Sequence, residues 1–154
     1  METTLASQSL ATVHAVTTAP AQRTTGASRG KLWAGRIITG FVSLFLAFDG
    51  VIKLLKLGPV MEGTIKLGYP TSTVLGMGVV LLSCLALYLV PRTAVFGAVL
   101  LTGYLGGAIA THVRVGDPLF SHTLFPIYVA VMIWGGLYLR DSRVRAAIAA
   151  RARA

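Results

Sequence analysis

The chain has 154 residues, of which 55% are hydrophobic and only 12% are charged, and its mean hydropathy is +0.74. These values lie outside the usual range of soluble globular proteins of this length and indicate a membrane protein with one domain. The formal net charge of +9 does not indicate a nucleic-acid partner, because the Lys and Arg residues flank apolar segments and do not alternate with exposed aromatic residues.

Residues 1–30 form a tail rich in Thr, Ser and Ala, without the apolar periodicity of a helix. Such a segment buries too little apolar surface to offset the entropy lost on ordering, so we expect it to be disordered. The first residues include Glu2 and lack both a basic start and an apolar core. We therefore expect no cleaved signal peptide.

Four apolar segments follow, each near the roughly 20 residues that cross about 30 Å of hydrocarbon as a helix. They cover approximately residues 32–55, 74–90, 94–111 and 119–139. Unpaired backbone polar groups are costly in lipid, so all four should be α-helices. The predicted fold class is all-α: an integral membrane four-helix bundle in a domain of residues 31–141, followed by a basic tail, residues 142–154.

The stretch between the first two spans reads GPVMEGTIKLGYPTST, residues 58–73. It is too short and too polar to cross the membrane, but several of its residues are apolar. A short helix lying across the outer mouth of the bundle would bury them.

The distribution of basic residues predicts the orientation of the bundle. Of the 14 Lys and Arg residues, ten fall on one side and only Lys53, Lys56, Lys66 and Arg114 on the other. Basic residues next to spans favour the cytoplasmic side, so both termini should be cytoplasmic. The Arg- and Ala-rich tail is suited to a helix on an anionic membrane surface.

The third span contains Gly103, Gly106 and Gly107, and the first and last of these form a GxxxG pattern. Small residues at this spacing let two helix backbones approach closely in lipid, where packing replaces the hydrophobic driving force. The contact is either within the bundle or between two copies of the chain. We favour packing within the bundle.

Polar residues gather at the outer ends of the first, third and fourth spans once both termini are placed inside. We take six of them as candidate ligand-binding residues: Asp49, Lys53, Thr111, His112, Arg114 and His122. A carboxylate at the centre of a membrane helix costs roughly 2.5–3.5 kcal/mol, so Asp49 is a functional candidate. Lys53 follows one turn later, and a structural ion pair of the two is the alternative.

His112 and His122 lie on opposite arms of a helical hairpin and should approach each other. The sequence has no HExxH motif and no paired CxxC motif, so we expect no metal site. Proton or ligand handling is favoured, because histidine titrates near neutral pH. Of the neighbouring residues, Asp117 or Ser121 should cap the fourth helix, and Pro126 should kink it.

Four stretches, FDGVIKL, LGYP, GYLGGAIATHVRVGDPLF and IYVAVMIWGGLYLRD, resemble the DoxX-like family of small four-helix bacterial membrane proteins. The resemblance covers about residues 32–141. It implies a helical bundle in the bacterial inner (plasma) membrane. The family takes its name from a membrane subunit associated with thiosulfate and quinone oxidation, and relatives have been linked to redox-stress complexes. It transfers no catalytic residue, and the single Cys84 departs from relatives that work through cysteine pairs.

We expect a non-catalytic membrane subunit or accessory protein of respiratory or redox-stress machinery, with a quinone or lipid-like ligand bound among a few convergent polar groups in an apolar bundle. One alternative is a quinone-linked oxidoreductase component in which His112 or His122 exchanges protons, although the sequence has no flavin motif, haem-ligand pair or metal cage. The other is a homo-oligomeric scaffold or a small transporter, although four spans are few for alternating access.

Overall fold

The computed structural model describes residues 25–151, and this part of the chain is helical with no strands. The elements are α2 (Thr25–Leu54), α3 (Gly58–Lys66), α4 (Thr73–Leu89), α5 (Ala94–Val115), the short π-helix η1 (Leu119–Thr123), α6 (Phe125–Arg140) and α7 (Ser142–Arg151). The disorder expected of residues 1–24 lies outside the described range, but for residues 25–30, which were expected in the same tail, the expectation is wrong because they belong to α2. The all-α prediction is confirmed.

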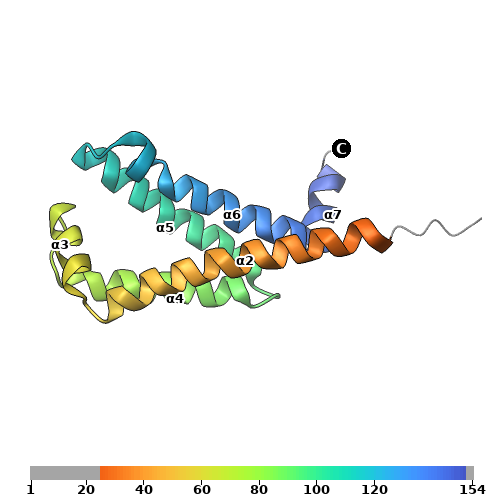
Figure 1. Cartoon of the computed structure of the whole chain (residues 1–154), viewed down its shortest axis with the longest axis horizontal. Coiled ribbons are helices and arrows are strands. Elements are labelled where there is room, and N and C mark those ends of the chain that lie inside the picture. The colour runs from red at the N-terminus through yellow and green to blue at the C-terminus, as the bar shows by residue number, and fades with distance from the viewer. Residues whose placement is uncertain (1–24, 152–154) are drawn as a thin grey trace, which may run out of the picture.

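The four long helices form a ring, in which α2 packs against α4 and α6, and α5 also packs against α4 and α6. Figure 1 shows α3 and the α5–α6 connection at one end of the bundle, and α7 with the start of α2 at the other. We call these ends the loop pole (the end of α2, α3, the start of α4, the end of α5 and η1) and the terminal pole (the start of α2, the α4–α5 turn, the end of α6 and α7) (Figure 1).

The helices have the length and the surface of membrane spans. Three stretches, Arg29–Leu54, Ala94–Val115 and Leu119–Arg140, are long and apolar enough to cross a bilayer, and α4 is a shorter apolar helix of 17 residues. Large apolar side chains on α2 point outward: Phe41, Leu44 and Phe48 are 64%, 72% and 65% exposed. An apolar outer surface of this extent is stable in lipid but not in water, and the chain is a multi-pass membrane protein.

Tyr88 of α4 joins three helices in the core. Its hydroxyl donates a hydrogen bond of 2.9 Å to the Ile133 carbonyl of α6 and lies 3.4 Å from Thr39 Oγ1 of α2. Arg140 donates to the Tyr88 carbonyl at 2.8 Å, and its guanidinium carbon lies 4.7 Å from the centre of the Tyr88 ring. These bonds satisfy buried polar groups between helices, which lipid would leave unpaired.

Glycines permit the closest helix contacts, but they are not the glycines of the GxxxG pattern. A Cβ atom at Gly136 would lie 2.7 Å from Thr39 Oγ1, and one at Gly50 would lie 2.6 Å from the Leu82 side chain. By contrast, a Cβ atom at any of the three α5 glycines, Gly103, Gly106 and Gly107, would meet no atom within 4 Å. These three glycines therefore border open space in this structure, and the helix packing expected of them stays a prediction.

The hairpin between α5 and α6 differs most from the expected one. Helix α5 continues to Val115 and ends at Gly116, whose φ of +72° is the left-handed conformation that glycine adopts without strain. The fourth span is not one kinked helix, since α6 begins only after η1 and places Pro126 in its first turn, where no helical N–H is lost. Neither η1 nor α6 has a side-chain cap, so the capping role expected of Asp117 or Ser121 is also wrong.

Two shorter segments complete the fold. Helix α3 forms within residues 58–73, as expected, and buries Thr64, whose hydroxyl donates to the Val60 carbonyl. Helix α7 occupies most of the basic tail, and none of its residues is buried.

Candidate functional site

A cavity of about 460 Å³ lies at the loop pole between helices that are distant in sequence. Side chains of α2, α3, α5 and α6 line it, together with Tyr69 from the α3–α4 connection and Met77 from α4. Most of the lining is apolar, and the main polar exceptions are Asp49, Lys53, Tyr69, Tyr104, Thr111 and His112. The site thus combines an apolar wall with a few polar groups, the usual composition of a small-molecule pocket.

Asp49 and Lys53 contribute an ion pair to the α2 wall of the cavity. Lys53 Nζ donates to Asp49 Oδ1 at 2.5 Å, and the Lys53 and Asp49 side chains are 15% and 32% exposed. The helical spacing of four residues places both groups on one face of α2. The expected pair is present, and because both partners line the cavity, either one can exchange its partner for a bound polar group.

Tyr69 and Thr111 connect the α3–α4 segment to α5 across the cavity. The Tyr69 hydroxyl lies 2.8 Å from Thr111 Oγ1, and Thr111 donates its own hydroxyl to the Gly107 carbonyl at 2.9 Å. A hydroxyl has one hydrogen to donate, so Tyr69 is the donor to Thr111. This arrangement leaves the lone pairs of the Tyr69 oxygen as acceptors near the cavity.

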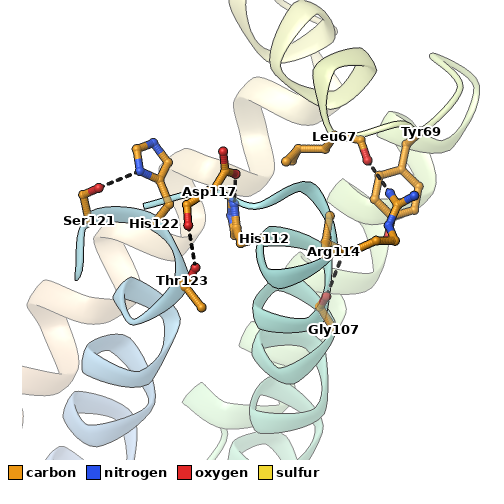
Figure 2. A network of polar contacts seen from close by, with 10 residues as sticks. Leu67, Tyr69, Gly107, His112, Arg114, Asp117, Ser121, His122 and Thr123 are labelled. Atoms are coloured by element: carbon orange, nitrogen blue, oxygen red, sulfur yellow. Dashed lines mark hydrogen bonds and ion pairs between the residues drawn. The ribbon is translucent and has the colours of Figure 1, made fainter. Parts of the chain in front are cut away.

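Arg114 lies outside the cavity and holds its cover in place. Its Nη2 atom donates to the Leu67 carbonyl, just after α3, at 2.5 Å, and its guanidinium carbon lies 5.8 Å from the centre of the Tyr69 ring (Figure 2). The contact tethers the end of α3 to the end of α5. Arg114 is therefore a positioning residue in this structure, in contrast to the ligand-binding role expected from the sequence, which stays a prediction.

His112 lines the cavity and is oriented by Asp117. Its Nδ1 atom lies 2.6 Å from Asp117 Oδ2, and the Asp117 backbone N–H donates to the His112 carbonyl at 3.1 Å. A carboxylate only accepts, so Nδ1 carries a hydrogen and Nε2 remains for another partner. The turn at Gly116 makes this pairing possible, because it folds the chain back over the last turn of α5.

His122 approaches His112 but does not line the cavity. The ring centroids are 5.8 Å apart and the planes meet at 60°, which confirms the expected proximity. Figure 2 shows His122 with Ser121, whose Oγ lies 2.8 Å from His122 Nδ1, at the outer edge of η1. Within residues 25–151, no three His, Cys, Asp or Glu side chains lie close enough to hold a metal ion together.

Four of the six candidate residues thus line one cavity, namely Asp49, Lys53, Thr111 and His112. Three further residues of the site were not predicted from the sequence, namely Tyr69, Tyr104 and Asp117. Tyr104 precedes Thr111 by seven residues, two helical turns on the same face of α5, so the helical spacing contained a signal for it. Tyr69 had none, because its position depends on how α3 folds back over the bundle.

Comparison with curated proteins and with solved structures gives no match. The model of the DoxX-like family matches residues 37–136, which span most of α2 through α6 and include every lining residue named above. Since this match covers more than half of the sequence, the chain belongs to the DoxX-like family.

Proposed function

We propose that this chain is a non-catalytic membrane subunit or accessory protein that binds a quinone or another lipid-like molecule in the cavity at the loop pole. The observation that carries the proposal is the meeting of Asp49, Thr111 and His112, from two different helices, around one apolar space. The cavity volume of about 460 Å³ suits a ring-sized head group.

The polar groups complement a ligand with carbonyl or hydroxyl oxygens. The Tyr104 hydroxyl, the Lys53 ammonium and the His112 ring can donate to a carbonyl, and the Asp49 carboxylate can accept from a hydroxyl. The same residues are too few and too widely mixed with apolar side chains to hold a strongly charged, hydrophilic solute. The oxidoreductase alternative needs an electron carrier from a partner subunit, whereas ligand binding needs only the groups already present.

Native mass spectrometry of the gently extracted complex tests the proposal, since it detects bound molecules and partner chains together. The wild type should retain a quinone or lipid, and Asp49→Asn and His112→Ala should each lose it. Glu62→Gln and His122→Ala are matched controls, because both residues belong to the loop pole but lie outside the cavity lining. A ligand that survives both cavity variants, or is absent from the wild type, contradicts the proposal.

We also propose that the protein lies in the bacterial inner membrane with both termini in the cytoplasm. Eight basic residues of the described range belong to the terminal pole: Arg29, Lys31, Arg36, Arg92, Arg140, Arg143, Arg145 and Arg151. The loop pole has only four basic residues, Lys53, Lys56, Lys66 and Arg114, and it also holds the acidic residues Asp49, Glu62 and Asp117. The positive-inside rule then places the loop pole outside.

Cysteine labelling of intact cells tests this orientation, because the natural Cys84 is buried. A membrane-impermeant maleimide should label Ser121→Cys at once and Ser142→Cys only after permeabilisation. The opposite pattern would reverse the orientation.

Self-association is the second candidate, favoured by the open space beside Gly103, Gly106 and Gly107. Either a second copy or a subunit of redox machinery would then cover this face of α5. Native mass spectrometry also reports this, since replacement of Gly103 and Gly107 by leucine should change the oligomeric state or the recovered partners. Unchanged stoichiometry and partners would remove the scaffold reading.

A further inference from the structure

A second hollow, the lateral groove, lies on the outer side of the seam between α5 and α6. Its volume is about 320 Å³, and its lining includes Thr102, Gly106, Ile109, Ile127, Val131 and Trp134. Ile127, Val131 and Trp134 are 41%, 65% and 36% exposed, so the groove opens toward the lipid. Two polar side chains of the lining are paired with each other, because Trp134 Nε1 donates a hydrogen bond to Thr102 Oγ1 at 3.0 Å.

The cavity and the lateral groove adjoin. Leu105 and Pro126 line both, so these two buried side chains form the partition between them. Gly103 and Gly107 lie on the cavity side and Gly106 on the groove side, and a Cβ atom at any of the three would meet no atom within 4 Å. The partition is thin because these three positions of α5 are glycines, which have no side chain to fill the seam.

The seam is also the less extensive of the two contacts that α6 makes with the long helices α2 and α5. Helix α6 packs more extensively on α2 than on α5, and Pro126 stands at the junction of η1 and α6, where it contributes no backbone N–H to the helical ladder. Movement of the Leu105 side chain together with the start of α6 would join the two spaces, and Pro126 has no N–H whose hydrogen bond this movement could break.

We propose that the α5–α6 seam is a lateral portal, and that the ligand is an amphiphile with a polar head and a single hydrocarbon chain. The head lies in the cavity beside Asp49 and His112, the chain passes Leu105 and Pro126, and its end lies in the lateral groove. The groove extends along α6 from Pro126 to Trp134, about 12 Å at 1.5 Å per residue. The inference rests on the proposed function. It adds to that function the hydrocarbon chain of the ligand and the route by which the ligand enters from the membrane.

Photocrosslinking of the full chain in lipid nanodiscs tests the route. The probe is a decyl-substituted dimethoxy-methyl-benzoquinone with a diazirine in its tail. Peptide mapping should find the crosslinks at Ile109, Ile127 or Val131, and excess unlabelled decylquinone should abolish them. Crosslinks that instead fall on the outward face of α2 and resist competition would overturn the portal.

Gly106→Leu tests the role of the groove in affinity. The new side chain enters open space, so the fold is retained, and it occupies the place of the hydrocarbon chain. Decylquinone binding should weaken about tenfold, equivalent to about 1.4 kcal/mol, while the same quinone without a tail should bind as in the wild type. Gly40→Leu is the matched control, because a Cβ atom at Gly40 of α2 also meets nothing within 4 Å.

The outcomes separate the portal from the proposed function. If Gly106→Leu binds both quinones as the wild type does, the portal is wrong and the cavity proposal stands. If the variant binds decylquinone with wild-type affinity but no longer forms the oligomer of the wild type, the portal is wrong and the groove is a contact between copies of the protein. If neither quinone binds to the wild type, quinone binding in the cavity is refuted, and the portal with it.

Discussion

Asp117 Oδ2 lies 2.6 Å from His112 Nδ1, across the left-handed turn at Gly116. The contact fixes the imidazole ring at the rim of the cavity and determines which nitrogen remains for a ligand. A histidine held in this way by a carboxylate has one tautomer and one orientation. Asp117 therefore acts on the cavity through His112, without lining it itself.

Asp117→Asn should weaken ligand binding without unfolding the protein. The amide can still occupy the same place, but it lacks the charge that strengthens the bond to the ring, a bond worth about 1.5–3 kcal/mol. We expect affinity to fall about tenfold. Nitrogen NMR of the histidine ring should show a mixture of tautomers at His112. Ser121→Ala, which removes the neighbour of His122 instead, should leave both affinity and the His112 spectrum unchanged, and an equal effect of the two variants would refute the role of Asp117.

The Asp49–Lys53 pair should stabilise the bundle by a moderate amount. Removal of one partner from a buried pair costs about 3–5 kcal/mol, but both of these side chains keep contact with the cavity and solvent, so we expect about 1–2 kcal/mol for Asp49→Asn or Lys53→Met. The double variant should recover part of this loss, because it leaves no unpaired charge. Unfolding in mixed detergent micelles measures each free energy. Strictly additive losses would show that the two residues do not interact.

The helical class, the positions of the long apolar helices and the gathering of polar residues at one pole were predictable from sequence. They follow from hydropathy, from the distribution of Lys and Arg, and from the helical spacing of residues such as Asp49 and Lys53. Each depends on a local pattern that tertiary packing does not alter. The short helix α3 was predictable for the same reason.

The packing of the glycines was not predictable. GxxxG shows that α5 has a face without side chains, but whether a helix, a second copy or a cavity occupies that face depends on the crossing of the helices. In this fold, close contacts fall at isolated glycines such as Gly50 and Gly136, which no motif marks. The Asp117–His112 pair was missed because the capping of a helix start is the commoner role of an aspartate in a turn.

Arg114→Met should loosen α3 at the loop pole. The substitution keeps an apolar stem of similar length but removes the donor to the Leu67 carbonyl and the cation near the Tyr69 ring. Since the contact is exposed, we expect the equilibrium constant for local opening of α3 to increase by only about threefold to tenfold. Hydrogen exchange should accelerate in residues 58–66 and not in α6. Lys66→Met is the matched control, and equal exchange in the two variants would contradict the tether.

Gly136→Ala should destabilise the bundle, although alanine is the better helix former. The added Cβ would lie 2.7 Å from Thr39 Oγ1 and 3.2 Å from the Thr39 nitrogen, so α2 and α6 must separate. Overpacking of this kind typically costs about 1–3 kcal/mol. Gly103→Ala is the matched control, since its Cβ enters open space and alanine should stabilise the helix by up to about 1 kcal/mol. A free energy of unfolding for Gly136→Ala that equals or exceeds that of the wild type would show that α2 and α6 are not in close contact at Gly136.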